Sequence, residues 1–238
     1  MDNHSEKQRK RVIGNPNLSL HYETCYRGLP VQVSSGPLVA EWLEKIYQSM
    51  MEQLAKHSRV LVLRIDLRFP SSYWGYEDEL LDNRYLSDFT RYLQDSLNQL
   101  PGNRNHSLMV LAAREYEAQE RKPHFHLLIL LNGNAIRGTG KWDIWRNNLY
   151  ARLHEAWAYR LGMHPSQVVG LIQFANGGGF SAGVQNRIKY GSMLLHRGDD
   201  QEFKELFRAS SYLAKVATKS FYDGCRPFIS PRLAFTDW

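Results

Sequence analysis

The apolar residues of this 238-residue chain follow two spacings, which predict two kinds of secondary structure. A stripe repeating every three to four residues predicts a helix, whereas alternating or short continuous apolar runs between turn residues predict strands. Helices are expected over residues 37–57, about 85–99, 142–161 and 199–219. Strands are expected over residues 59–69 and 168–174, with a hairpin over residues 108–132. Residues 13–35 and the C-terminal tail are expected to be irregular, and residues 184–195 fit either a helix or a loop.

From residue 59 onward, the predicted order is strand, helix, strand, strand, helix, strand and a final helix. This is the split βαβ, or ferredoxin-like, order of an α+β protein. We therefore expect an antiparallel sheet with helices on one face, and the final helix over the otherwise open face. The chain shows no internal repeat. Residues 13–238 are expected to form a single domain with an N-terminal extension, preceded by a mobile basic arm at residues 1–12.

Tryptophans are prominent in the predicted helix over residues 142–161. Trp142, Trp145 and Trp157 lie close to helical spacing with the leucines of that segment. A large residue in such a stripe packs against the core. We therefore expect these tryptophans to be core residues rather than platforms for stacking nucleic-acid bases.

Composition and charge narrow the class of protein. The chain is 43% hydrophobic and 12% aromatic, which is typical of a globular protein. Its apolar runs are shorter than the roughly 20 residues of a membrane span, and no signal-peptide core follows the charged N-terminus. Cys25 and Cys225 lack metal-type spacing, so reduced thiols and a cytoplasmic location are expected. A net charge of +6 favours a polyanionic partner.

The predicted hairpin carries a candidate metal site. His124 and His126 are two residues apart in its second strand, so their side chains project from one face. Folding the hairpin about residue 120 places Glu115 opposite them, and two imidazoles with a carboxylate suit a divalent cation. The alternative is a pair of partly buried structural histidines. Asp66, on the polar side of the strand over residues 59–69, is a further candidate ligand; with Arg64 and Arg68 it either lines the site or faces solvent.

The final predicted helix carries a candidate nucleophile. Tyr212, Lys215 and Lys219 lie at i, i+3 and i+7, on one helical face. A tyrosine hydroxyl beside two ammonium groups and a cation is suited to attacking a phosphodiester. The alternative is a packed tyrosine with two solvated lysines. Arg187 and Lys189 either contact phosphate or face solvent.

Taken together, these motifs resemble those of a known superfamily. His124-Phe125-His126, followed downstream by Tyr212 and Lys215 in a Tyr-x-x-Lys pattern, resembles the HUH endonucleases. The histidines precede the tyrosine along the chain, which is the order in rolling-circle replication initiators rather than in relaxases. Three segments of the chain are similar to the inovirus gene-two-protein-like (YagK/YfjJ-type) replication proteins of phages and prophages: RVLVLRIDLRFP, KPHFHLLILLN and SSYLAKVATKSF. The resemblance spans about residues 13–232.

The resemblance implies the HUH fold and a metal-dependent enzyme that nicks and joins single-stranded origin DNA. His124 and His126 are expected to hold Mg²⁺ or Mn²⁺, with Glu115, or else Glu117 or Asp66, as third ligand. Tyr212 is expected to form a 5′-phosphotyrosine and release a 3′-hydroxyl, with Lys215 at the phosphate and Lys219, Arg187 and Lys189 on the DNA.

The implied role is replication initiation in a bacterial host cell. A host helicase and polymerase are expected partners, because the chain contains no helicase motif. Some relatives carry a second tyrosine four residues after the first, where this chain has Val216. The joining step therefore needs another group, such as a second protomer, another tyrosine or an activated water.

Other functions fit parts of the pattern. A transposase-type HUH nickase would use the same chemistry in a different biological role. A ferredoxin-like nucleic-acid-binding regulator would use the sheet without catalysis, although it usually presents aromatic residues where this chain has histidines. A two-histidine phosphoesterase would need a second strand with a His-x-Thr/Ser motif, and the predicted strands contain none.

Overall fold

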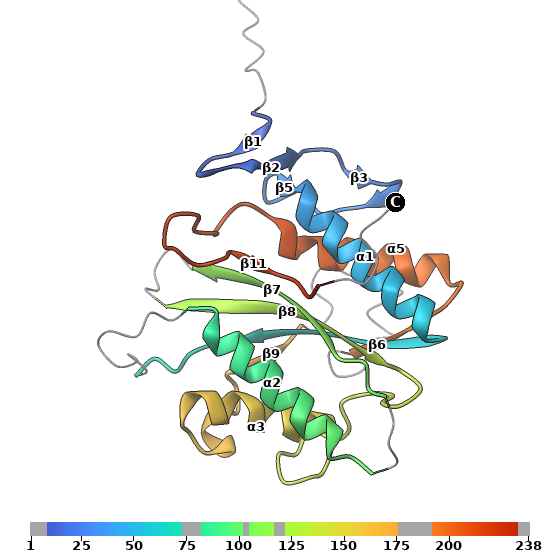
Figure 1. Cartoon of the computed structure of the whole chain (residues 1–238), viewed down its shortest axis with the longest axis vertical. Helices are drawn as coiled ribbons and strands as arrows, with labels where there is room; N and C mark the ends of the chain where they lie inside the picture. Colours follow the sequence, from blue (N-terminus) through green and yellow to red (C-terminus); the bar gives the residue numbers. More distant parts are fainter. Residues whose placement is uncertain (1–8, 73–81, 102–104, 117–121, 176–191, 233–238) are drawn as a thin grey trace, which may run out of the picture.

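The centre of the molecule is an antiparallel sheet. The computed structural model describes residues 9–72, 82–101, 105–116, 122–175 and 192–232. The strands lie in the order β10-β6-β8-β7-β11, and β9 also pairs with β6 (Figure 1). Their bounds are β6 Arg59–Leu67, β7 Met109–Tyr116, β8 Pro123–Asn132, β9 Ile172–Phe174, β10 Ser192–His196 and β11 Phe228–Ile229. The antiparallel α+β class predicted from the sequence is therefore confirmed.

Helices cover both faces of this sheet (Figure 1). Residues Leu61, Leu63 and Ile65 of β6 pack with α2 (Arg84–Asn98) and α3 (Leu149–Leu161) on one face. Val60 and Val62 pack with α1 (Ala40–Lys56) and α5 (Asp200–Ser210) on the other. The prediction that only the final helix would lie over the second face is thus wrong. The reason is β8, which is buried from Pro123 to Leu131 and needs cover on both faces.

The helix α3 begins later than its tryptophan spacing suggests. The Asn148 side chain accepts a hydrogen bond from the Ala151 backbone nitrogen at 2.9 Å, which caps the helix and makes Leu149 its first residue. Trp142 and Trp145 precede the helix and are 45% and 74% exposed, whereas Trp157 is fully buried. The core prediction therefore holds for Trp157 and is wrong for the other two.

The predicted helix over residues 199–219 also ends early. α5 stops at Ser210 and is followed by the 3₁₀ helix η2 (Ser211–Ala214). Directly after η2, Lys215 is extended, and the Val216 backbone nitrogen donates to Pro37 O at 3.1 Å. The Tyr116 nitrogen then donates to Thr218 O at 3.0 Å, where Thr218 has a φ of 70°. These tertiary backbone bonds replace the helical ones that the amphipathic pattern predicted.

Short strands replace the irregular segment that was expected over residues 13–35. β1 (Arg11–Val12), β2 (Asn15–His21) and β5 (Leu38–Val39) make a three-stranded sheet, and β3 (Cys25–Tyr26) pairs with β4 (Leu29–Pro30). Two residues of the predicted arm, Arg11 and Val12, are thus in a strand, while residues 1–8 lie outside the described ranges.

Two further segments refine the predictions. Within residues 168–174, only β9 is a strand, because the 3₁₀ helix η1 (Pro165–Val168) and a turn precede it. Residues 192–195 belong to β10, and residues 184–191 lie outside the described ranges. In the ranges that the structure describes, no helix has the length and apolar character needed to cross a membrane.

The tryptophans provide a stability test of this architecture. Trp157 packs against Phe69 and Phe89, and its indole nitrogen donates to Arg68 O at 2.9 Å. We expect Trp157→Ala to lower the free energy of unfolding by about 3–5 kcal/mol. The exposed Trp145→Ala should change it by less than about 0.5 kcal/mol. Urea denaturation of both variants measures the difference, and equal losses would contradict the placement of the two side chains.

Candidate active site

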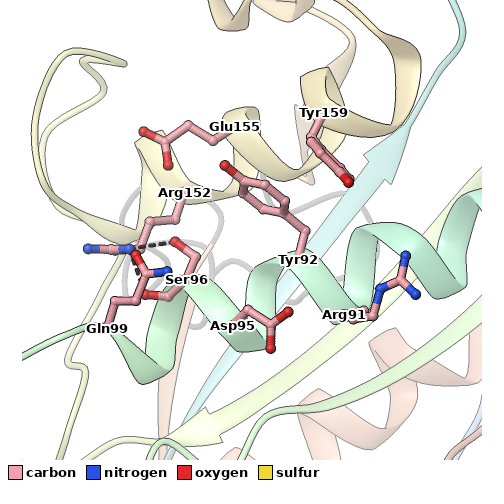
Figure 2. Close-up of a pocket in the computed structure, with 8 residues that line it drawn as sticks. All are labelled: Arg91, Tyr92, Asp95, Ser96, Gln99, Arg152, Glu155 and Tyr159. Atoms are coloured by element: carbon pink, nitrogen blue, oxygen red, sulfur yellow. Dashed lines mark hydrogen bonds between the residues drawn. The ribbon is translucent and has the colours of Figure 1, made fainter.

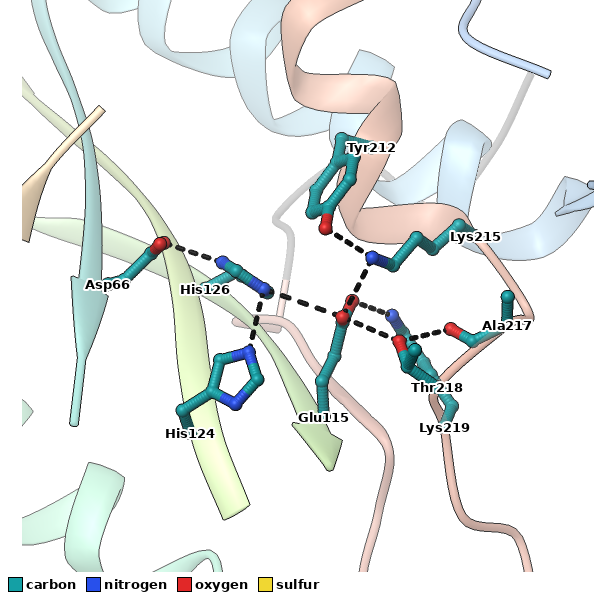
Figure 3. A network of polar contacts seen from close by, with 9 residues as sticks. All are labelled: Asp66, Glu115, His124, His126, Tyr212, Lys215, Ala217, Thr218 and Lys219. Carbon is teal, nitrogen blue, oxygen red and sulfur yellow. Dashed lines mark hydrogen bonds and ion pairs between the residues drawn. The ribbon is translucent and has the colours of Figure 1, made fainter. Parts of the chain in front are cut away.

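The polar residues of the site come from the ends of three neighbouring strands. In β8, His124 and His126 point to the same face as Leu128, on the side covered by α1 and α5. Glu115 of β7 lies directly opposite His124, and Asp66 of β6 lies opposite His126. The alternation of side chains along paired strands therefore brings these groups together (Figure 3). The hairpin pattern predicted the position of Glu115 opposite the histidines.

Three donor atoms lie at distances suited to one cation. The Nε2 atoms of His124 and His126 are 3.1 Å apart, and His126 Nε2 is 3.4 Å from Glu115 Oε2. Neighbouring ligands that each lie about 2.1 Å from a common ion are separated by about 3.0–3.4 Å. Glu115, His124 and His126 are all buried, with ligand atoms within 4.8 Å of one another. This donor set fits a divalent cation of the kind that the sequence predicted.

Asp66 lies behind the histidines rather than among the ligand atoms. Its Oδ1 is 2.6 Å from His126 Nδ1. Burial alone would raise the pKa of Asp66, but the hydrogen bond and charge of His126 outweigh it and lower that pKa. A carboxylate bonded to Nδ1 keeps a histidine in the tautomer whose Nε2 can bind a metal. Asp66 is thus placed to orient His126, and Glu117, the other candidate ligand, lies outside the described residues.

Glu115 is the electrostatic centre of the site. Its Oε1 accepts a bond from Lys219 Nζ at 2.6 Å, and its Oε2 lies 2.9 Å from Lys215 Nζ and accepts from Thr218 Oγ1 at 2.6 Å. Burial opposes the charged form, but hydrogen bonding to His126 and the charge of Lys219 hold the pKa of Glu115 well below its usual range. The carboxylate is therefore ionised at neutral pH.

The Lys219 side chain lies inside the protein rather than on its surface. It is fully buried against Glu115. Burial lowers the pKa of Lys219 to about 8, against the opposing effect of Glu115. The predicted direct contact with DNA is therefore replaced by a contact with Glu115. Arg187 and Lys189, the other two predicted DNA contacts, lie outside the described residues.

Tyr212 lies on the histidine face. It projects from η2, and its hydroxyl accepts a hydrogen bond from Lys215 Nζ (Figure 3). Its ring is 5.2 Å from that of His126, in an edge-on arrangement. Lys215 therefore connects the tyrosine hydroxyl to Glu115, one of the three candidate metal ligands. Tyr212 and Lys215 lie together as predicted, but they belong to the 3₁₀ helix η2 and its C-cap rather than to an α-helix.

A pocket lies between α2 and α3, on the opposite face of the sheet from this site (Figure 2). Its lining contains no histidine or cysteine, and Arg152 already donates to Ser96 O at 2.7 Å. The residues for which the sequence predicted a catalytic role lie at the site described above, on the other face of the sheet.

Sequence reasoning missed the contribution of Thr218. Its hydroxyl reaches Glu115 because the chain turns at a positive φ after η2, which no local pattern predicts. Arg64 was only one of several polar residues along β6, yet the structure places it beside Tyr212, with its guanidinium carbon 5.9 Å from the ring centre.

Known proteins match most of the chain. The model of the YagK/YfjJ C-terminal domain matches residues 22–230. The Escherichia coli (strain K12) "Uncharacterized protein YfjJ" is 28% identical over 210 residues, covering 81% of this chain and 94% of that protein. The "Uncharacterized protein YagK" of the same strain is 23% identical over 215 residues, covering 83% and 95%. No solved structure gives a significant match.

A metal titration tests the donor set. We expect Mn²⁺ to raise the melting temperature of the wild-type chain, because binding at about 100 times Kd contributes about 2.7 kcal/mol. His126→Ala should abolish most of this rise. His196→Ala is the matched control, since His196 is half-exposed and pairs with Glu202 away from the site. An equal rise in the wild type and His126→Ala would exclude His126 as a ligand.

Acid titration tests the burial of Glu115. Because its pKa in the folded chain is below the unfolded value of about 4.3, the unfolded state takes up the proton first as the pH falls. The stabilisation by Glu115 is therefore complete above about pH 5 and is lost below it. We expect the free energy of unfolding to fall less steeply from pH 5 to pH 3 in Glu115→Gln than in the wild type. The control Glu23→Gln, at an exposed position, should keep the wild-type slope.

Proposed function

We propose that this chain, which belongs to the YagK/YfjJ C-terminal domain family, is a metal-dependent enzyme that nicks and joins single-stranded DNA through Tyr212. The observation that carries the proposal is the connection from Tyr212 through Lys215 to Glu115, beside the paired histidines. A hydroxyl nucleophile, a cation that contacts it and a metal-type donor set are the parts that phosphodiester cleavage by tyrosine requires.

His124, His126 and Glu115 are the residues that would hold Mg²⁺ or Mn²⁺. When bound there, such a cation supplies Lewis-acid polarisation of the phosphoryl oxygens. Asp66 maintains the ring orientation of His126 through the 2.6 Å contact with Nδ1. Since these residues lie on strands, the geometry of the donor set is supported by the backbone pairing of the sheet.

Tyr212 is the nucleophile in this proposal. Its hydroxyl loses a proton to solvent, and the oxygen forms a bond to phosphorus while the bond from phosphorus to the 3′ oxygen breaks. The 3′ oxygen takes up a proton from solvent, so the products are a 5′-phosphotyrosine and a 3′-hydroxyl. Lys215, whose ammonium contacts the Tyr212 hydroxyl, stabilises the phenolate and the charge that develops on the phosphate.

The biological role that we propose is rolling-circle replication initiation for a phage or prophage, in the cytoplasm of a bacterial host. The free 3′-hydroxyl would prime a host polymerase, and a host helicase would unwind the origin. The ferredoxin-like assignment belongs to this proposal. It is supported by the chain order β6-α2-β7-β8-α3-β9, combined with strand pairing in the order β9-β6-β8-β7. A transposase would use the same chemistry, and the substrate distinguishes the two roles.

Rejoining of the DNA needs a second nucleophile in this scheme. Val216 stands four residues after Tyr212, where some HUH enzymes carry another tyrosine. The 3′-hydroxyl of a second DNA end fits this role, because its attack on the phosphotyrosine reverses the first step and restores Tyr212. The reverse reaction uses the same residues as the nick.

Adduct formation tests the proposal. Incubation with a pool of single-stranded oligonucleotides and Mn²⁺ should give a protein–DNA adduct that survives a denaturing gel. Tyr212→Phe should give none, His126→Ala should be severely weakened, and chelation of the metal should abolish the product. The control Tyr159→Phe alters a tyrosine that is 61% exposed on α3 and should behave as wild type.

Two outcomes would overturn the proposal. An adduct that persists in Tyr212→Phe would show that another residue is the nucleophile. Tight binding of DNA by the wild type, without any adduct or cleavage across the pool, would favour the non-catalytic regulator.

A further inference from the structure

The polar cluster around Tyr212 carries more positive than negative charge. Its cationic side chains are Arg64, Lys215 and Lys219, and its carboxylates are Asp66 and Glu115. Both lysines contact Glu115, and Asp66 contacts His126. Within the described part of the chain, Arg64 is therefore the cation of this cluster that has no carboxylate in contact. A divalent cation at the histidines would increase the positive excess.

Arg64 is buried in spite of its charge. The residue is 8% exposed, and its Nη1 atom has no hydrogen-bond partner among the residues that the structure describes. A guanidinium stays protonated under all ordinary conditions, and a buried donor atom without a hydrogen bond costs free energy. Burial at this position lowers the pKa of Arg64, with Asp66 and Tyr212 acting in the opposite direction. The fold thus maintains an unsatisfied donor beside the tyrosine.

The position of Arg64 indicates what would satisfy this donor. Its guanidinium carbon lies 5.9 Å from the centre of the Tyr212 ring, and it extends from the same strand face as Asp66. Lys215 Nζ lies 3.8 Å from the centre of that ring. A group bonded to the Tyr212 oxygen would therefore meet positive charge from both Lys215 and Arg64. The chemistry that fits is an anion with several acceptor oxygens, which describes a phosphodiester.

We propose that Arg64 is a phosphate ligand, whose Nη1 donates a hydrogen bond to a non-bridging oxygen of the DNA phosphate at Tyr212. The proposal deepens the function proposed above and rests on it for the identity of the phosphate. In the nicking step, a bond forms between the Tyr212 oxygen and phosphorus, and the bond to the 3′ oxygen breaks. Arg64 remains protonated throughout and stabilises the negative charge that accumulates on the non-bridging oxygens. It holds the phosphotyrosine diester in the same way afterwards.

The first arm of the test uses inorganic phosphate as the probe and needs no DNA cleavage. Phosphate should raise the melting temperature of the wild type more than chloride at equal ionic strength, because it binds the folded state. Arg64→Gln should lose this difference. Arg59→Gln is the matched control: it removes the same charge from the same strand, at a residue whose Nε donates to Asn134 away from the site. A phosphate response in Arg64→Gln equal to that of the wild type would overturn the proposal, as would the lack of any response in the wild type.

The second arm measures the rate of adduct formation with Mn²⁺. Arg64→Gln should slow it about 100-fold or more, which is typical for removal of a donor to a transition-state oxyanion. Arg64→Lys keeps the charge but not the planar fork, so we expect a smaller loss of about tenfold. Arg59→Gln should react at the wild-type rate. An unchanged rate in Arg64→Gln would overturn the proposed role.

The two arms separate this proposal from the function on which it rests. If the wild type binds phosphate through Arg64 but forms no adduct that depends on Tyr212, the nickase fails and the anion site stands. A merely structural role predicts a different result: Arg64→Gln and Arg64→Lys would both melt well below the wild type without phosphate. Since Nη1 has no partner to lose among the described residues, we expect both variants to stay folded and to melt no lower than the wild type, and a large drop in both would overturn the assignment.

Discussion

The site depends on one buried carboxylate. Glu115 is 1% exposed, so its negative charge has to be compensated by protein groups rather than by water. His126, Lys215, Thr218 and Lys219 all supply contacts to it. The last three of these come from the chain beyond η2, a hundred residues or more after Glu115 in the sequence. The charge of one side chain therefore fixes the C-terminal segment against the sheet and, with it, the position of Tyr212.

The backbone reinforces this attachment. The backbones of Lys215 and Leu38 form an isolated β-bridge. The Val216 nitrogen donates to Pro37 O, and the Tyr116 nitrogen donates to Thr218 O. These bonds connect the N-terminal segment, the final segment and β7. Tyr212, on the short 3₁₀ helix η2, is therefore held in place by segments from both ends of the chain. The nucleophile role proposed for Tyr212 needs such preorganisation.

The electrostatics of the site relate the proposed metal and the proposed phosphate. Two ammonium groups, those of Lys215 and Lys219, contact Glu115, and burial lowers the pKa of Lys219 to about 8. Arg64 adds positive charge that no described carboxylate contacts. Under the proposed function, DNA brings the anion that this surplus lacks. The phosphate of the DNA then neutralises the excess positive charge of the site. The buried guanidinium of Arg64, which is unfavourable for folding on its own, thereby contributes to binding.

The sequence by itself determined the local part of this site. His124, His126 and Glu115 face one another because side chains alternate along a strand and because a hairpin pairs its own neighbours, both short-range effects. The same reasoning identified Tyr212 and Lys215 as a pair, since three residues bring side chains together in a 3₁₀ turn as well as in an α-helix. The amphipathic pattern also predicted α1, α2 and the buried Trp157.

Only the tertiary structure decided where elements end and what covers them. Trp142 and Trp145 continue the helical spacing of α3, but a side-chain cap at Asn148 excludes them from the helix. The stripe of α5 continues to Lys219, but backbone bonds to Pro37 and Tyr116 draw the chain out of the helix after Ala214. Lys219 is consequently buried against Glu115 rather than exposed. Long-range contacts of this kind compete with local helix propensity. The spacing of apolar residues along the chain does not reveal which distant residues make those contacts.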